Sequence, residues 1–367
     1  STQAKTLFPY TTLFRSWLKA MLGQDVAQYL GFANYVTTSG TATTDNLLTL
    51  DKMASGGTVV LTNTVTTKGI AVAVKDAGVS GHNSDVLNVI ARVDASDVTH
   101  GLLTVANVET VNIKAEDISV TATDATTIKT STLTLKADKA TSSTITGNAH
   151  LTLNLDAATD KLVTVNATDL TGNLTLDAHG KAAMTITGGS GADTIKASVG
   201  ATAKADVIVG GAGNDILYAG SNGATLTGGA GNDLFMLVNT AGNNTGGGTF
   251  AYNTYTTIED FQAGDLLQLV LNAGASTVAA KFAKLEAKVL GAVNSDSYIS
   301  SVMDQLKTQG GGAVWFKHGS DTYIVADVGA NSNGATFVGN EDLIIKLAGV
   351  DGANLSFNSD YGTIALI

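Results

Sequence analysis

The chain has 367 residues, a formal net charge of −11, 44% hydrophobic residues and only 14% charged residues. The negative balance argues against a nucleic-acid partner, which needs clustered Lys and Arg. The lack of cysteine excludes disulfides and thiolate metal sites. No apolar run reaches the length of about 18 residues that a membrane-spanning helix requires.

Residues 1–16 differ in composition from the rest of the chain, and they hold the single proline, Pro9, among aromatic residues. They are similar to translated sequencing-adapter sequence, and we interpret them as a non-native leader, with a short natural leader as the alternative. Residues 17–40 form a short separate segment. Apolar spacing there predicts a helix over Ser16–Tyr29.

Short period-two alternations of apolar residues recur over residues 41–187, for example in Val108–Ile113, Leu151–Leu155 and Leu174–Leu176. Thr or Asn fills many intervening positions, and such alternation is typical of short strands. Strands repeated without helices between them indicate a stacked β-solenoid or a sandwich. The solenoid is favoured because the pattern runs directly into the glycine-rich repeats that follow.

The nonapeptide Gly-Gly-x-Gly-x-Asp-x-apolar-x occurs three times within residues 188–270. Its glycines and aspartates are the candidate metal ligands: Gly188, Gly189, Gly191, Asp193, Gly210, Gly211, Gly213, Asp215, Gly228, Gly229, Gly231 and Asp233. Two units between the intact copies are degenerate. Ala201–Val209 keeps Asp206 but no glycine of the motif, and Ala219–Thr227 has Ala224 in place of the aspartate.

These residue types suit calcium. Glycines reach the backbone conformations that turn carbonyl oxygens towards a common point, and the aspartate adds a carboxylate. Calcium takes about six to eight such hard oxygen ligands. Because one turn offers too few of them, we expect each ion to lie between two stacked turns of a β-roll.

If each nonapeptide is half a circuit, units eighteen residues apart share an edge. The three intact turns then share one edge, provided that Ala197–Gly200 only enlarges a turn. We predict two ions, one between Asp193 and Asp215 and one between Asp215 and Asp233. Asp215→Ala should be the most damaging change. Asp206→Ala should be nearly silent, because the facing unit offers no second carboxylate.

Asp260 and Asp265 follow the last repeat and are candidates for a terminal calcium site. Residues 271–367 are predicted to form a small α+β cap. Helical spacing covers Val278–Leu290 and Ser297–Leu306, and Lys281–Lys288 within the first is amphipathic, with packing favoured over membrane binding.

A hairpin is predicted beyond these helices, from Val314–Lys317 to Thr322–Ala326. The fold class is therefore all-β dominated: a parallel β-solenoid running into a β-roll, with an α+β carboxyl-terminal cap.

The nonapeptide resembles the calcium-binding repeat of RTX (hemolysin-type) proteins, which form parallel β-rolls. A wider set of segments resembles the carboxyl-terminal part of Caulobacter-type surface-layer proteins, in the same order from about Ser84 to the end. These segments are SDVLNV, VANVETVNIKAED, TLTLKA, TGNAHLTLN, AVWFKHGSDTYIVADV and GATFVGNEDLIIKL.

The resemblance implies a structural protein secreted by a Gram-negative bacterium, whose copies associate into a calcium-dependent lattice on the cell surface. It also implies export by a type I secretion machinery that reads an uncleaved signal within residues 271–367. In that family a large amino-terminal part anchors the layer to lipopolysaccharide. Only a short segment precedes the resemblance here, so we expect the chain to be a fragment whose anchor lies upstream.

RTX repeats also follow the catalytic parts of secreted enzymes. The five histidines, His82, His100, His150, His179 and His318, form no HExxH zinc motif, and the chain has no Gly-x-Ser-x-Gly elbow. We expect these histidines at the surface or in turns, and no enzymatic activity. The alternatives are the carboxyl-terminal carrier region of a truncated type I-secreted hydrolase, or an RTX adhesin.

Overall fold

The computed structural model describes residues 34–37, 48–62, 64, 69–120, 128–178, 181–197, 206–219, 223–238, 255–270, 282–284, 302, 312–327, 342–358 and 363–367. The chain forms two compact units, Ser1–Leu162 and Val163–Ile367. In the described residues, no helix is long and apolar enough to cross a membrane.

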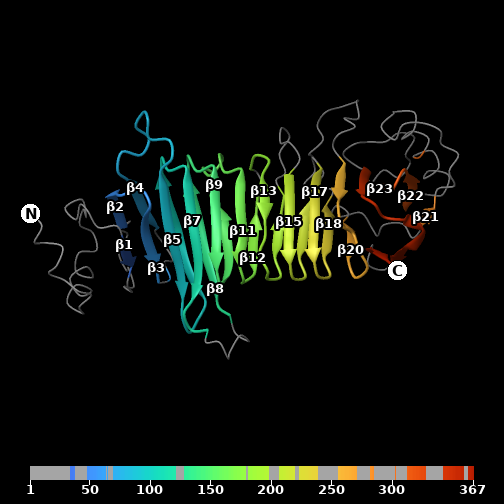
Figure 1. Ribbon diagram of the computed structural model, residues 1–367, viewed down its shortest axis with the longest axis horizontal. Coiled ribbons are helices and arrows are strands. Elements are labelled where there is room, and N and C mark those ends of the chain that lie inside the picture. The colour runs from blue at the N-terminus through green and yellow to red at the C-terminus, as the bar shows by residue number, and fades with distance from the viewer. Residues whose placement is uncertain are drawn as a thin grey trace, which may run out of the picture. The chain divides into compact units, whose positions relative to one another are not determined.

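The first unit consists of strands that alternate between two parallel sheets (Figure 1). One sheet has the order β1 (Asn34–Thr37), β3 (Gly57–Leu61), β5 (Val86–Val93), β7 (Thr110–Asp117) and β9 (Ser142–Gly147). The other has the order β2 (Leu48–Met53), β4 (Ile70–Val74), β6 (Val98–Ala106), β8 (Thr130–Ala137) and β10 (His150–Leu155). Odd and even strands fall in different sheets, so each circuit of the chain contributes one strand to each sheet.

The core of the first unit follows from the period-two alternation. In β5, Leu87, Val89 and Ala91 are buried while the residues between them are half-buried. The half-buried positions form polar contacts between neighbouring strands, as where the Asn112 side chain donates a hydrogen bond of 3.0 Å to that of Asn88. Apolar side chains therefore fill the inside of each circuit, and polar ones line the outside.

The second unit continues the same pattern. One sheet has the order β11 (Thr164–Leu170), β13 (Thr185–Thr187), β15 (Asp206–Ala212), β17 (Ala224–Ala230), β19 (Thr256–Ile258), β24 (Asp342–Leu347), β23 (Asp321–Asp327), β22 (Gly312–His318) and β21 (Phe282–Lys284). The other has the order β12 (Leu174–Asp177), β14 (Thr194–Lys196), β16 (Ile216–Ala219), β18 (Leu234–Val238), β20 (Leu266–Val270), β26 (Thr363–Leu366) and β25 (Leu355–Asn358). A 3-10 turn, η3 (Gly352–Asn354), precedes β25. The Thr-rich strands β11 to β13 are thus continuous with the strands of the glycine-rich repeats.

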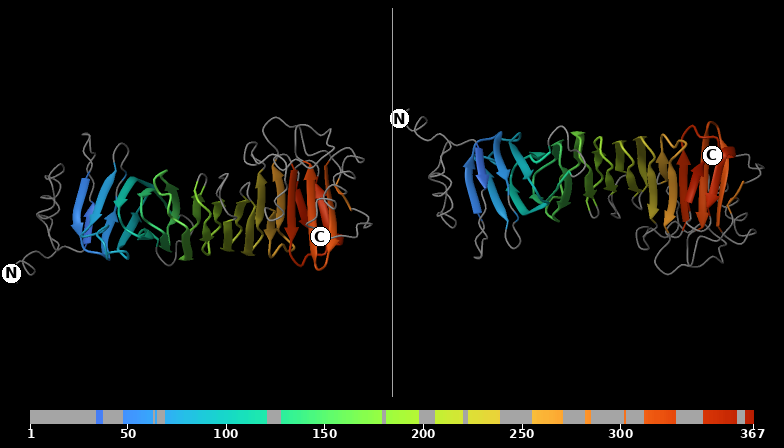
Figure 2. Two further views of the ribbon diagram at one scale, coloured as in Figure 1. Left: turned by 90° about the horizontal axis from the view of Figure 1, so that it is seen from above. Right: turned by 90° about the horizontal axis from the view of Figure 1, so that it is seen from below.

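Parallel pairing gives way to antiparallel pairing at the carboxyl-terminal end of the second unit. β24 pairs in parallel with β19, and β23 and β22 follow it in antiparallel order. In the other sheet, β26 pairs antiparallel with β20, and β25 pairs with β26. Figure 2 shows these red strands beside the orange strands of the last circuit. They cover the backbone edges of β19 and β20, which would otherwise be exposed.

The predicted parallel β-solenoid is confirmed, and so is the hairpin, which is formed by β22 and β23. Trp315 and Phe316 on this hairpin are buried. The helix predicted over Val278–Leu290 is wrong at Phe282–Lys284, which form β21 and pair with β22. Backbone pairing with β22 satisfies N–H and C=O groups on the facing edges of the two strands, and in so short a segment it overrides apolar spacing.

Other expectations fall largely outside the described residues. The predicted helix over Ser16–Tyr29 lies outside them, and of Ser297–Leu306 only the buried Val302 is described. Of the five histidines, His82 and His318 are exposed, as expected. His100 is not, because it lies on β6 with 2% of its surface exposed.

Candidate calcium-binding edge

The three intact turns lie on one edge of the second unit. Gly188–Asp193 leads from β13 to β14, Gly210–Asp215 from β15 to β16, and Gly228–Asp233 from β17 to β18, so each passes from the first sheet to the second. The apolar eighth residues stack in register, Ile195 beside Leu217 and Leu217 beside Phe235. The second step is eighteen residues, one full circuit. The first is four residues longer, and the extra residues fall between β14 and β15, on the opposite edge.

The two degenerate units, Ala201–Val209 and Ala219–Thr227, lie on the opposite edge and contain one aspartate, Asp206. Asp206 lies in register with Ala224, as predicted. Asp206 is nevertheless buried, with 1% of its surface exposed, and its Oδ1 accepts a hydrogen bond of 2.6 Å from the Met184 backbone N–H. Its carboxylate therefore has a structural partner on its own edge.

On the first edge, the aspartates form a ladder of hydrogen bonds between turns. The Leu174 N–H donates to Asp193 Oδ1 at 2.7 Å, the Asp193 N–H to Asp215 Oδ1 at 2.7 Å, and the Asp215 N–H to Asp233 Oδ1 at 2.9 Å. Asp193, Asp215 and Asp233 each have only 1% of their surface exposed. The ladder holds the turns in register and stacks their carboxylates on one another.

The second carboxylate oxygens differ along the ladder. Asp193 Oδ2 accepts a hydrogen bond of 2.7 Å from the Gly189 N–H. Asp215 Oδ2 and Asp233 Oδ2 are buried without a hydrogen-bond partner in the described residues, a condition that they share there with only one other carboxylate oxygen, Asp85 Oδ2. A buried carboxylate oxygen without a donor is costly, so these two atoms point to a ligand.

The glycines of the turns are required by close contacts. A β carbon at Gly188, Gly210 or Gly228 would overlap the Oδ2 atom of the aspartate in the same turn. A β carbon at the second glycine of a turn, as at Gly211 or Gly229, would overlap a carbonyl oxygen of the preceding turn. Both of these glycines also have positive φ, 119° and 101°. The motif therefore brings carboxylate and carbonyl oxygens close together.

Burial and neighbouring negative charges raise the pKa values of aspartates in the ladder. The pKa of Asp215 is raised to about 7, chiefly by burial; the carboxylates of Asp193 and Asp233 also raise it, and the hydrogen bond from the Asp193 N–H lowers it. Burial likewise raises the pKa of Asp193 to about 6. The carboxylates thus repel one another at this edge, and a cation would relieve that repulsion.

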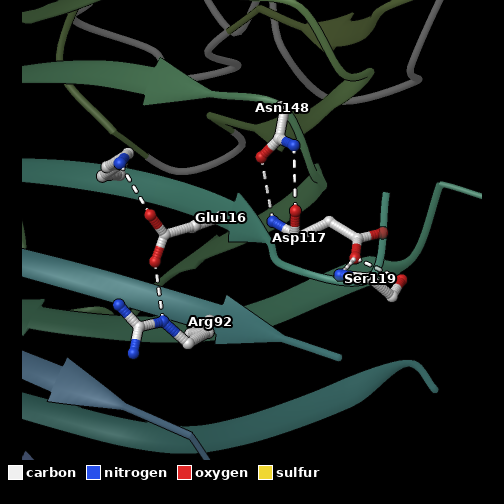
Figure 3. Close-up of polar contacts among 6 residues, drawn as sticks. Arg92, Glu116, Asp117, Ser119 and Asn148 are labelled. Carbon is white, nitrogen blue, oxygen red and sulfur yellow. Dashed lines mark hydrogen bonds and ion pairs between the residues drawn. The ribbon is translucent and has the colours of Figure 1, made fainter. Parts of the chain in front are cut away.

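A buried aspartate of the first unit provides a contrast (Figure 3). Asp117 Oδ1 accepts hydrogen bonds from both the backbone N–H and the hydroxyl of Ser119, and its Oδ2 accepts one from the Lys129 N–H. Asn148 binds both the N–H and the C=O of the Asp117 backbone. Burial raises the pKa of Asp117, but the hydrogen bonds that Ser119 and Lys129 donate to its carboxylate lower it, and the net shift is downward. Asp117 is therefore held by the protein itself.

Neighbouring strands of the first unit carry an ion-pair cluster that is also shown in Figure 3. Glu116 on β7 pairs with Arg92 on β5 at 2.6 Å and with Lys114 at 2.7 Å. Its charge is matched within the protein, unlike those of the aspartate ladder.

The structure adds two features to the edge, of which the sequence prediction missed the first. Asn173 Oδ1 accepts a hydrogen bond of 3.0 Å from the Ala192 N–H, and Asn214 Oδ1 accepts one of 2.9 Å from the Asn232 N–H, so asparagine side chains join two pairs of stacked turns by exposed hydrogen bonds. Asp265 also extends the aspartate ladder, since its Oδ1 accepts a hydrogen bond of 2.9 Å from the Asp233 N–H. The sequence prediction named Asp265 as a candidate for a terminal calcium site, and the equal length of the two turns that precede Asp233 and Asp265 is the signal that could have placed it in the ladder.

The oxygen donors at this edge fit calcium. In the part of the chain that the structure describes, no three His, Cys, Asp or Glu side chains are grouped to hold a metal ion. Stacked turns instead offer one carboxylate each, together with backbone carbonyls, and such hard oxygen donors suit calcium. Asp193, Asp215 and Asp233 are the side chains that would hold it. A bound ion would neutralise the carboxylates and join adjacent turns.

Comparison with known families supports this assignment. The RTX calcium-binding nonapeptide repeat (4 copies) matches residues 185–201 and 200–235. A search of curated proteins found no match to the chain. The matched segment contains all three intact turns and both degenerate units. Repeats of this kind are typical of secreted, calcium-binding proteins, so the chain carries an RTX-type calcium-binding segment.

Proposed function

We propose that this protein is a structural surface-layer protein whose β-roll is stabilised by calcium outside the cell and whose copies associate into a lattice. The observation that carries the calcium part is the one-sided ladder, in which Asp215 and Asp233 each have a buried carboxylate oxygen without a partner in the described residues. The lattice part rests on the similarity of the segments from about Ser84 onward to surface-layer proteins.

The occupancy of the calcium sites would depend on the calcium concentration of the compartment. Extracellular calcium modules bind with a Kd of about 10⁻⁴–10⁻³ M. Sites of that affinity are empty at cytosolic calcium levels and filled outside the cell. The aspartate ladder therefore suits a chain that is exported before its roll is stabilised. Type I export would be directed by residues 271–367.

The proposal is tested by assembly. Purified protein should form sheets or large oligomers at millimolar calcium and should disperse when EGTA is added, as followed by electron microscopy and analytical ultracentrifugation. A strictly monomeric protein at every calcium concentration would count against the lattice and for a carrier region of a secreted hydrolase.

A further inference from the structure

The turn that follows the last matched repeat, Glu259–Asp265, repeats the geometry of the calcium-binding edge without its sequence. It connects β19 to β20 and so lies on the same edge as the three intact turns. Leu226 pairs with Ile258, and Leu234 pairs with Leu266. Seven residues lie between Leu226 and Leu234, and seven lie between Ile258 and Leu266, so Asp265 stacks directly on Asp233.

Asp265 has the contacts of a ladder member. It is 1% exposed, and its Oδ1 accepts a hydrogen bond from the Asp233 N–H at 2.9 Å. The equivalent bond from the Asp215 N–H to Asp233 has the same length. Gly264 has a φ of 105°, and a β carbon there would overlap the Asn232 side chain. This turn is therefore as closely stacked as the consensus turns are on one another.

Two side chains of this turn, those of Asp260 and Gln262, form hydrogen bonds with the backbone of the preceding turn. The two carboxylate oxygens of Asp260 accept hydrogen bonds of 2.8 Å from the backbone N–H groups of Gly228 and Gly229. Gln262 Nε2 donates a hydrogen bond of 3.0 Å to the Gly229 carbonyl. Asp260 is engaged with these two donors, and we assign it a positioning role.

The positions of the unpaired carboxylate oxygens indicate that Asp265 is a member of the ladder. Its end members have both oxygens satisfied: Asp193 by the N–H groups of Leu174 and Gly189, and Asp265 by those of Asp233 and Gln262. The two members that retain a buried Oδ2 without a partner in the described residues are Asp215 and Asp233. A ladder that ended at Asp233 would have only Asp215 in its interior. Both unpaired atoms are interior when the ladder includes Asp265.

We propose that a further calcium ion binds between the turns Gly228–Asp233 and Glu259–Asp265, held by the carboxylates of Asp233 and Asp265 together with carbonyl oxygens of the two turns. This proposal rests on the calcium role proposed above. It makes the ladder a stack of three ions and not two. Asp233, like Asp215, then serves two ions.

The test is calcium stoichiometry, measured by equilibrium dialysis with metal analysis at millimolar free calcium. The unmodified chain should bind three ions. Asp265→Asn and Asp193→Asn should each lose one ion, whereas Asp215→Asn and Asp233→Asn should each lose two. Asn keeps an oxygen for the ladder hydrogen bond while removing the charge, and circular dichroism checks that each variant remains folded. Asp206→Asn is the matched control, equally buried but on the opposite edge, and should still bind three.

Two bound ions in the unmodified chain, with no change in Asp265→Asn, would overturn the additional site and leave the calcium role intact. Should Asp265→Asn fail to fold, Asp233→Asn and Asp193→Asn still decide the question, because equal losses from these two variants would refute the proposal. Absence of any bound calcium in the unmodified chain would instead overturn the proposed calcium role itself.

Discussion

Asp206 resembles the ladder aspartates in sequence position and in burial, but its surroundings differ. Its partner in register is Ala224, and its Oδ1 accepts a hydrogen bond from the Met184 N–H. The sequence alone predicts that Asp206→Ala is nearly silent. With the structure in hand, we expect unchanged calcium stoichiometry but a loss of about 1–3 kcal/mol in the free energy of unfolding, because a buried N–H loses its acceptor.

Urea denaturation at saturating calcium measures the loss for Asp206→Ala. Asp206→Asn, which keeps an acceptor oxygen, should lose less stability than Asp206→Ala. Equal stability of the unmodified protein and Asp206→Ala would show that the Met184 hydrogen bond contributes nothing.

Asp215 should make the calcium-free protein sensitive to pH. Burial raises its folded-state pKa to about 7, above the value of about 3.9 expected for an unfolded chain. The folded state therefore holds the proton more tightly. Protonated Asp215 therefore stabilises the folded state fully below about pH 4, and this stabilisation is lost as the pH rises through about 7. Other carboxyls, such as Asp117, are shifted in the opposite direction.

The effect of Asp215 is therefore measured by comparing the pH dependence of the melting temperature in the unmodified protein and in Asp215→Asn. Between pH 4.5 and 7.5, the melting temperature of the calcium-free protein should fall more than that of Asp215→Asn. Parallel pH profiles for the two proteins would contradict the shift. Calcium should reduce the difference, because it favours the ionised carboxylate.

At the scale of elements, β26 protects the end of one sheet. It pairs antiparallel with β20, and its Ile364 is fully buried. Deleting Asn354–Ile367 removes β25 and β26 and exposes the edge of β20. We expect the shortened protein to form larger species as its concentration rises, as measured by size-exclusion chromatography in calcium.

A substitution at Ile367 is the control, because it changes the carboxyl terminus without removing β25 or β26. Ile367 is 83% exposed, so Ile367→Ser should leave the elution profile unchanged. A monodisperse deletion variant would show that β20 needs no cover. The same deletion should abolish type I export. Export assays therefore need a companion variant that keeps both strands, so that loss of the signal can be separated from loss of the cap.

For the whole molecule, calcium should decide whether the β-roll folds. At free calcium ten times Kd, each site adds about 1.4 kcal/mol of stability, so two sites add about 3 and three about 4. This is a large fraction of the stability of an ordinary domain, about 5–15 kcal/mol. Circular dichroism during an EGTA titration should show loss of β signal and a lower melting temperature. A titration that changes neither would contradict a stabilising role for calcium.

The sequence by itself determined the parts of this protein that depend on local chemistry. Period-two alternation predicted the strands, because each short strand must bury one face. The glycines and aspartates of the nonapeptide predicted the turns, because only these residue types fit beside the closely stacked oxygens. The eighteen-residue spacing of Gly210 and Gly228 placed these two turns on one edge, because eighteen residues make one circuit. The turn at Gly188 lies on the same edge because the four extra residues of its circuit fall on the opposite edge.

The tertiary structure decided what depends on pairing between distant segments. It placed Asp265 on Asp233, thirty-two residues away, although that turn lacks the glycines of the motif. It turned Phe282–Lys284 into a strand, because the backbone of β22 offered a partner. It also distinguished Asp117, whose carboxylate the protein satisfies, from Asp215 and Asp233, which each keep a buried oxygen without a partner in the described residues. Hydrogen-bond satisfaction depends on which backbone groups the fold brings to a carboxylate, and no local pattern of residues specifies that.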